Sequence, residues 1–283
     1  MLKFMLKGFV VVAIILASLI LPARATSIRE FPHQVWTGQS QLISLADRTL
    51  SPRELGQEAL RAAERGDFAT AEAYWTEILA DYPESAAAWS NRGITRASQG
   101  KLEDAIADYD RAIALAPLVT DPYLNRGAAL EALGQFEDAI DDYNRILKID
   151  PNDAQAYNNR GNAKMGLRDW QGAIADYQTC TEIAPNFAFA FAGKALATYQ
   201  VGDTDAAIQL MRNVNRKYPQ FADMRAALTA ALWVNGKQGE AESNWVAAVG
   251  LDSRYKDISW VKTFRRWPPA MLDALQKFLD LSP

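Results

Sequence analysis

Five prolines along the middle of this 283-residue chain are separated by one constant interval of 34 residues, without an insertion or a deletion. The same interval recurs for small residues, for large apolar residues and for glycines, so several registers repeat together. The prolines are Pro83, Pro117, Pro151, Pro185 and Pro219. Self-similarity at such a period is typical of an array of small units that stack on one another. This spacing constrains the fold more strongly than any single motif.

Each unit is predicted to contain two amphipathic helices joined by a tight turn, because apolar residues recur at helical spacing on either side of a central break. A glycine at the break can adopt the left-handed conformation that ends a helix, and the proline closes the second helix. These glycines are Gly66, Gly100, Gly134, Gly202 and Gly236, and Arg168 takes their place in one unit. Small residues in another register are predicted to let paired helices approach closely: Ala59, Gly93, Gly127, Gly161, Ala195 and Thr229.

A helix-turn-helix unit of this length, with these registers, resembles the tetratricopeptide repeat (TPR). The resemblance covers residues 52–255 and implies an all-α, right-handed superhelical solenoid. Its six units are 52–85, 86–119, 120–153, 154–187, 188–221 and 222–255. The last unit has Arg225 in place of an aromatic residue and Ser253 in place of the proline. Such departures are expected of a unit at the end of a stack.

The first 25 residues read as a secretory signal peptide. Lys3 and Lys7 precede a long apolar run, and an A-x-A cleavage signal ends at Ala25, so cleavage is expected between Ala25 and Thr26. An uncleaved membrane anchor is the alternative, but the run is shorter than the roughly 20 apolar residues that span a bilayer. The protein is therefore expected to be exported, to the periplasm or the thylakoid lumen.

Residues 26–51 link this signal to the first repeat, and they are expected either to form an ordered strap or short helix on that repeat or to be disordered. The link ends in a helix-start signal. Ser51 is predicted as the N-cap, Pro52 as the first helical residue and Glu54 as the partner of Ser51 in a capping box.

A capping segment is expected after the repeats, over residues 256–283. Pro268 and Pro269 begin a helix whose apolar stripe needs a surface to cover, and the open end of the solenoid is the surface we expect. The stripe consists of Met271, Leu272, Leu275, Phe278 and Leu279. Arg265 and Arg266 are expected to face solvent. The stretch WVKTFRRWPPAMLDALQKFLDL, with the signal peptide and the repeats, resembles TPR proteins of the thylakoid lumen of plants and cyanobacteria, which implies a protein near photosynthetic membranes.

The charge and the rare residues exclude several classes of function. The formal charge is -4, and removal of the three positive residues of the signal peptide gives -4 - 3 = -7. Nucleic acid is not an expected partner, because phosphate backbones are bound by clustered lysines and arginines. Cys180 and His33 are the only cysteine and histidine, which excludes histidine-dependent triads and multi-histidine metal sites. We expect no enzyme, cofactor or metal, a buried Cys180, and membrane contact only through a partner or an uncleaved signal.

The stretch YNNRGNAKMG, residues 157–166, has glycines and a lysine that suggest a phosphate-binding loop. No strand is predicted before it, and Leu167 and Arg168 follow in place of the lysine and hydroxyl residue of such a loop. Gly161 also belongs to the small-residue register. Helix packing is therefore the favoured interpretation of this stretch.

The triplet Asn-Arg-Gly occurs three times, each time on the first helix of a unit. In TPR proteins the first helices line a concave groove, so the resemblance implies that Asn91, Asn125 and Asn159 form a ladder that meets the main chain of an extended peptide. Asn158 and Glu131, on the same helices, complete the candidate groove residues. The alternative is that these asparagines bond neighbouring helices or water.

The arginines of the triplets are predicted to pair with acids of the second helices: Arg92 with Asp108, Arg126 with Asp142 and Arg160 with Asp176. Exposed pairs of this kind contribute about 0–1 kcal/mol each. Some TPR proteins hold a partner's carboxylate with lysines, but Ser90 and Gln155 occupy two of those lysine positions here. A carboxylate clamp is therefore not expected.

The sequence favours a non-catalytic scaffold that binds a protein or peptide segment in its concave groove. A photosynthetic membrane complex is one possible setting for it. The alternative is a structural spacer or self-assembling module that uses its hydrophobic C-terminal end.

Overall fold

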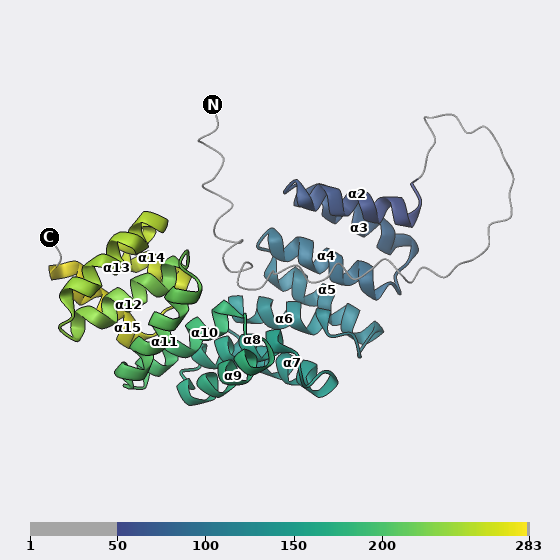
Figure 1. Ribbon diagram of the computed structural model, residues 1–283. Coiled ribbons are helices and arrows are strands. Elements are labelled where there is room, and N and C mark those ends of the chain that lie inside the picture. Colours follow the sequence, from purple (N-terminus) through teal and green to yellow (C-terminus); the bar gives the residue numbers. More distant parts are fainter. Residues whose placement is uncertain (1–49, 282–283) are drawn as a thin grey trace, which may run out of the picture. The chain divides into compact units, whose positions relative to one another are not determined.

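The computed structural model describes residues 50–281, and every regular element in that range is a helix (Figure 1). These residues divide into two compact units with their boundary between Ala129 and Leu130, called unit 1 and unit 2 below. The predicted signal peptide, its predicted cleavage point and most of the predicted strap fall within residues 1–49, which lie outside the described residues. Each unit is built by packing successive helices against one another.

Twelve of the described helices form helix-turn-helix pairs within the bounds predicted for the six repeats. They are α2 (Pro52–Glu64), α3 (Phe68–Asp81), α4 (Ala86–Ser98), α5 (Leu102–Leu115), α6 (Asp121–Ala132), α7 (Phe136–Ile149), α8 (Ala154–Gly166), α9 (Trp170–Ile183), α10 (Ala188–Gln200), α11 (Thr204–Lys217), α12 (Ala222–Val234) and α13 (Gln238–Leu251). The even-numbered helix of each pair is the first helix of its repeat. The C-terminal segment follows with η1 (Ser253–Lys256), α14 (Ile258–Trp260), η2 (Val261–Arg265) and α15 (Pro269–Leu281).

The helix ends follow the predicted signals. The amide of Glu54 donates to Ser51 Oγ at 3.3 Å, and the amide of Ser51 donates to Glu54 Oε2 at 2.9 Å, which confirms the capping box. The glycines of the mid-unit register have positive φ angles, and Arg168 adopts the same left-handed conformation with φ 61°. The turn geometry is therefore kept even where the repeat lacks its glycine.

Glycines of the small-residue register lie directly beneath aromatic rings of the second helices. A Cβ atom at Gly93 would lie 2.6 Å from Tyr109 Cε1, and one at Gly161 would lie 2.8 Å from Tyr177 Cε1. Both rings are almost completely buried. Gly161 lies within α8, which confirms that YNNRGNAKMG is a helix-packing stretch.

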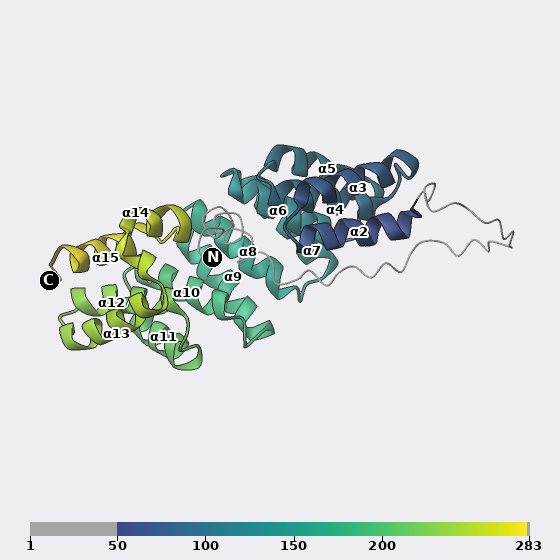
Figure 2. The same cartoon turned by 90° about the horizontal axis from the view of Figure 1, so that it is seen from above.

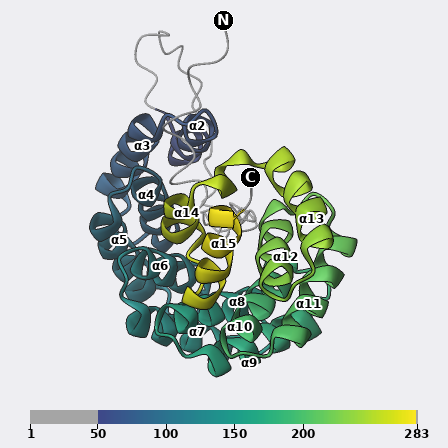
Figure 3. The ribbon, with the colours of Figure 1, turned by 90° about the vertical axis from the view of Figure 1, so that its left-hand side faces the viewer.

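The C-terminal helix α15 packs along α12 and reaches α10, and α12 lies between α13 and α15 in two views (Figures 2 and 3). Its stripe residues Met271, Leu275 and Phe278 are buried, as the stripe predicted. They cover the last repeat mainly along α12, and Phe278 also meets Trp245 of α13, while Val246 on the far side of α13 remains 71% exposed. That side of α13 also carries polar residues such as Glu242, whereas α12 is buried along almost its whole length and offers an apolar surface.

The glycine–ring contacts predict a specific stability change. Gly93→Ala would force its new methyl group into Tyr109, and such overpacking typically costs about 1–3 kcal/mol. Gly250→Ala, in α13, meets no atom within 4 Å and should instead stabilise the helix by about 0.5–1 kcal/mol. Urea denaturation of both variants measures the two changes. Equal effects in the two variants would contradict the close approach at Gly93.

Candidate functional site

The first helices carry all five candidate groove residues, and the structure gives them two different environments. Asn91 on α4 and Asn125 on α6 are partly exposed in unit 1. Asn158, Asn159 and Glu131, in unit 2, are buried, with exposed fractions of 1%, 0% and 8%. An asparagine on a first helix is therefore partly exposed in one unit and buried in the other.

The Asn159 side chain points into the packing between helices. Its Oδ1 accepts a hydrogen bond from Asn158 Nδ2 at 3.0 Å, and the side chain lies beside the hydroxyl of Tyr143 on α7. Asn158 Oδ1 and Asn159 Nδ2 are buried without a hydrogen-bond partner. The amide of Asn159 is therefore packed inside unit 2 and does not face solvent.

Glu131 is the acceptor at the centre of this buried group. The Tyr143 hydroxyl donates to Glu131 Oε1 at 2.5 Å. Burial raises the pKa of Glu131 to about 7, although the Tyr143 hydrogen bond and the charge of Arg266 act in the opposite direction. A carboxyl group with this pKa is partly protonated near neutrality, so the environment of Glu131 opposes its charge.

Arg92 and Arg160 form ion pairs that are buried more deeply than the sequence suggested, whereas Arg126 contacts the exposed Asp110. In unit 1, Asp108 is 2% exposed; it accepts from Arg92 Nη2 at 2.8 Å and from Arg96 Nη1 at 3.0 Å. In unit 2, Arg160 and Lys164 approach Asp176 at 2.6 Å and 2.8 Å. The residues of two predicted pairs are thus brought together, and each pair is joined by a second cation one helical turn further along.

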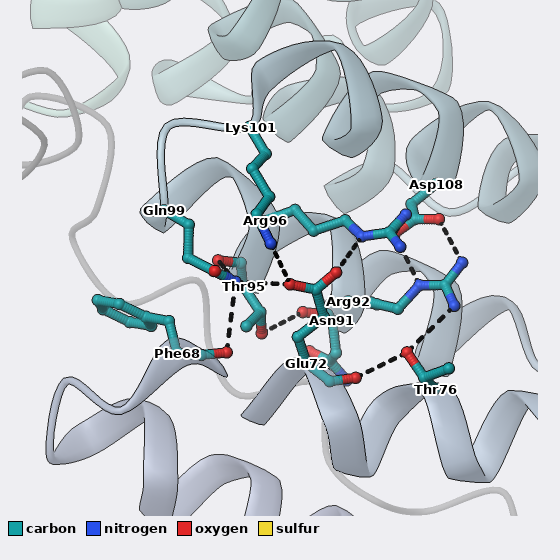
Figure 4. Close-up of polar contacts among 10 residues, drawn as sticks. All are labelled: Phe68, Glu72, Thr76, Asn91, Arg92, Thr95, Arg96, Gln99, Lys101 and Asp108. Atoms are coloured by element: carbon teal, nitrogen blue, oxygen red, sulfur yellow. Dashed lines mark hydrogen bonds and ion pairs between the residues drawn. The ribbon is translucent and has the colours of Figure 1, made fainter. Parts of the chain in front are cut away.

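Unit 1 extends its ion pair into a network around Glu72 of α3 (Figure 4). Arg96, Lys101 and Gln99 all donate to the Glu72 carboxylate at 2.8 Å. Burial alone would raise the pKa of Glu72, but the three hydrogen bonds outweigh it and hold the pKa at about 2. The network links α3, α4 and α5, so its charges are used within the fold.

Asp223, at the start of α12, is a buried acceptor that the sequence analysis missed. Its Oδ1 accepts from Tyr255 Oη at 2.7 Å, from Arg265 Nε at 2.8 Å and from Trp267 Nε1 at 3.0 Å. The expectation that Arg265 faces solvent was wrong, because its guanidinium is drawn to this carboxylate. Arg266 is exposed, as expected. A lone Asp in the first turn of a helix gives no signal in the sequence that three later residues converge on it.

The side chains that most often ligate metal ions are dispersed among the residues that the structure describes. None of their His, Cys, Asp and Glu side chains form a group of three or more that could hold a metal ion. The Cys180 thiol is buried, as predicted, and burial raises its pKa to about 12. Within residues 50–281, no helix is long and apolar enough to cross a membrane.

Loss of the buried ion pair in unit 1 should lower the free energy of unfolding much more than loss of an exposed pair. Asp108→Ala would leave the buried Arg92 guanidinium without its carboxylate, while the partly exposed Arg96 keeps Glu72; leaving a buried charge unpaired typically costs about 3–5 kcal/mol. The matched control is Glu240→Ala, which removes the exposed pair with Arg212 and should cost at most about 1 kcal/mol. Chemical denaturation compares the two losses. Similar losses would mean that burial does not decide the strength of these pairs.

Glu131 predicts a pH dependence of stability. Its carboxyl has a pKa near 4.5 in the unfolded chain and about 7 in the folded one, so the folded protein binds more protons between these values. The contribution of Glu131 is therefore most favourable below pH 4.5, falls by about 2–4 kcal/mol as the pH rises to 7, and remains low above it. Glu131→Gln keeps an oxygen for Tyr143 and should remove this fall. Parallel curves of unfolding free energy against pH for the two proteins would contradict the assignment.

Comparisons with known proteins agree with this geometry. Family models described as tetratricopeptide repeat match residues 57–119, 121–153 and 154–187. A comparison with curated proteins gave no match.

Several solved structures share the fold. A tetratricopeptide repeat protein from Parabacteroides merdae is 22% identical with a TM-score of 0.63, over 82% of this chain and 86% of that one. YrrB, described as a TPR protein with an unusual peptide-binding site, is 19% identical with a TM-score of 0.51, over 63% and 92%. The Cut9–Hcn1 hetero-tetramer of APC/C gives 18% identity and a TM-score of 0.62, over 80% of this chain and 42% of that one. At these identities the likeness concerns the fold, and with the family matches it identifies residues 57–119 and 121–187 as tetratricopeptide repeats in an all-α TPR solenoid.

Proposed function

We propose that this protein is a non-catalytic scaffold that binds an exposed segment of a partner protein on the first-helix face of unit 1. That face is defined here by Ser90, Asn91 and Ile94 of α4 and Asn125 of α6. Tetratricopeptide repeats support a role in protein binding, and YrrB, with a similar fold, is described as having a peptide-binding site.

The proposal depends mainly on the packing of α15 against the first helices of unit 2. On α10, Ala192 and Leu196 are buried in the same cluster as Met271 and Leu275 of α15. Three repeat lengths earlier, the equivalent positions on α4 are Ser90 and Ile94, and both are partly exposed. The positions that pack against α15 in unit 2 are thus partly exposed in unit 1. A partner segment could pack against them there.

The chemistry of the unit 1 face suits an uncharged segment. Ile94 and the 37% exposed Leu60 of α2 supply apolar surface, and the two asparagine amides can both donate and accept hydrogen bonds. The nearby Arg92 and Arg96 are engaged by Asp108. A partner segment with apolar side chains and accessible main-chain groups therefore fits this face best.

A self-assembling spacer is less well supported. That hypothesis needs the apolar stripe of α15 to be free for assembly, but Met271, Leu275 and Phe278 are at most 1% exposed within unit 2.

The setting of the scaffold is a further part of the proposal. Export to the periplasm or the thylakoid lumen rests on the signal-like sequence of residues 1–25. A role in the assembly or maintenance of a photosynthetic membrane complex rests on the resemblance of the C-terminal stretch.

A photo-crosslinking residue on the unit 1 face tests the proposal. With p-benzoylphenylalanine at Ser90, ultraviolet light should yield a discrete adduct with a partner protein in cells that express the full chain. The same residue at Arg111, exposed on the second helix α5, is the matched control and should not yield that adduct. Equal adducts from both positions would overturn the assignment of this face.

Substitution of the two exposed asparagines is a second, quantitative test of partner binding. Asn91→Ala combined with Asn125→Ala removes about two hydrogen bonds and should weaken partner binding by roughly 5- to 30-fold, with an unchanged melting temperature. Asn159→Ala is the contrasting variant, because its buried amide should affect stability instead. Undiminished binding by the double variant would show that the asparagines do not contact the partner.

A further inference from the structure

The C-terminal segment follows the last repeat directly and turns back over its first helix. From η1 onward it crosses the start of α12, and α15 then begins beside the end of α10 and runs along α12 (Figures 2 and 3). At the start of α15, the amide of Ala270 donates to Gln200 Oε1, on the last residue of α10, at 2.8 Å. This segment, residues 255–281, is called the tail below.

The tail is attached at one end by charge and hydrogen bonds. Tyr255, Arg265 and Trp267 all donate to the same oxygen of Asp223, which is 4% exposed. Hydrogen bonds to a carboxylate are roughly twice as strong as neutral ones. Asp223 is therefore a specific acceptor for one arginine and two aromatic donors.

The tail is attached at the other end by an apolar stripe. Met271, Leu275 and Phe278 recur at helical spacing and are buried. The Phe278 ring meets Trp233 of α12 edge-on at a centroid distance of 5.1 Å and Trp245 of α13 at 4.9 Å. The surface beneath the tail thus combines one buried carboxylate with an apolar surface of helical length.

The location of the tail distinguishes a bound segment from a simple end cap. A cap would cover the last helix of the stack, but Val246 and Leu251 of α13 are 71% and 41% exposed. The tail packs mainly on α12 and α10, the first helices, and touches α13 where Phe278 meets Trp245. It occupies in unit 2 the face that we propose binds a partner in unit 1.

We propose that the first-helix face of α10 and α12 is a second partner site, specific for an amphipathic helix preceded by an arginine and aromatic donors, and that the tail is its internal occupant. A partner segment of this chemistry displaces the tail and takes over Asp223. The inference extends the proposed scaffold function to unit 2, and its test does not use the unit 1 face.

The test uses a fluorescent synthetic peptide with the sequence of residues 255–281 and the full-length chain. Arg265→Ala in the chain weakens the tail but leaves Asp223 intact, so the added peptide, which carries its own arginine, should bind at least tenfold more tightly than it binds the wild-type chain. Asp223→Asn weakens the tail similarly but removes the carboxylate, so it should show no such gain. Fluorescence anisotropy measures the affinities, and amide hydrogen exchange in α15 measures release of the tail.

Several outcomes would overturn the proposal. Unchanged exchange in α15 and unchanged peptide affinity in Arg265→Ala would mean that the tail is a permanent part of the fold. Equal gains in Arg265→Ala and Asp223→Asn would mean that Asp223 does not select the ligand. A dimer of Arg265→Ala in light scattering would identify a second copy as the occupant in place of a separate partner. If Arg265→Ala fails to fold, Trp267→Phe replaces it in the same comparison, because it removes only one donor to Asp223. Crosslinking at Ser90 tests the unit 1 proposal separately, so failure of one proposal can be told from failure of the other.

Discussion

Each helix pair in this chain has an apolar side that only a neighbouring element can cover, and the rest of the architecture follows from that need. Within the units, neighbours approach closely because aromatic rings lie directly on glycines. Tyr177 is the clearest case, since Cβ atoms at Gly161 and at Gly193 would lie 2.8 Å and 2.5 Å from its ring. One ring thus joins two successive first helices, α8 and α10. The last pair, α12 and α13, is followed by residues 255–281, which fold back to cover its first helix.

Much of the fold could be predicted because the repeat specifies local geometry by position. Arg168 shows how strong this constraint is: it takes the left-handed conformation of the glycines it replaces. The route of the C-terminal segment could not be predicted, because the donors to Asp223 come 32, 42 and 44 residues later in the chain. An apolar stripe shows that a helix needs a surface, but several surfaces of the stack could satisfy it.

The candidate site was predictable only in part, because the same triplet recurs in different surroundings. Asn91 and Asn159 occupy equivalent positions, yet the first is partly exposed and the second is fully buried. The charged members of the triplets serve the fold. Asp108 and Asp176 neutralise Arg92 and Arg160 within the packing of the helices. That arrangement agrees with the absence of the clamp lysines and favours recognition by shape and main-chain hydrogen bonds.

The covalent attachment of the tail changes what an affinity for unit 2 would mean. A tethered segment is present at its own site at an effective concentration on the order of millimolar, whatever the concentration of the protein. A free partner with identical contacts must exceed that local concentration before it occupies half of the sites. The tail would therefore set a threshold concentration for partner binding to unit 2. Weak or scarce helices would not displace the tail. Helices that are abundant, or that bind Asp223 and the apolar surface more tightly than the tail does, would displace it.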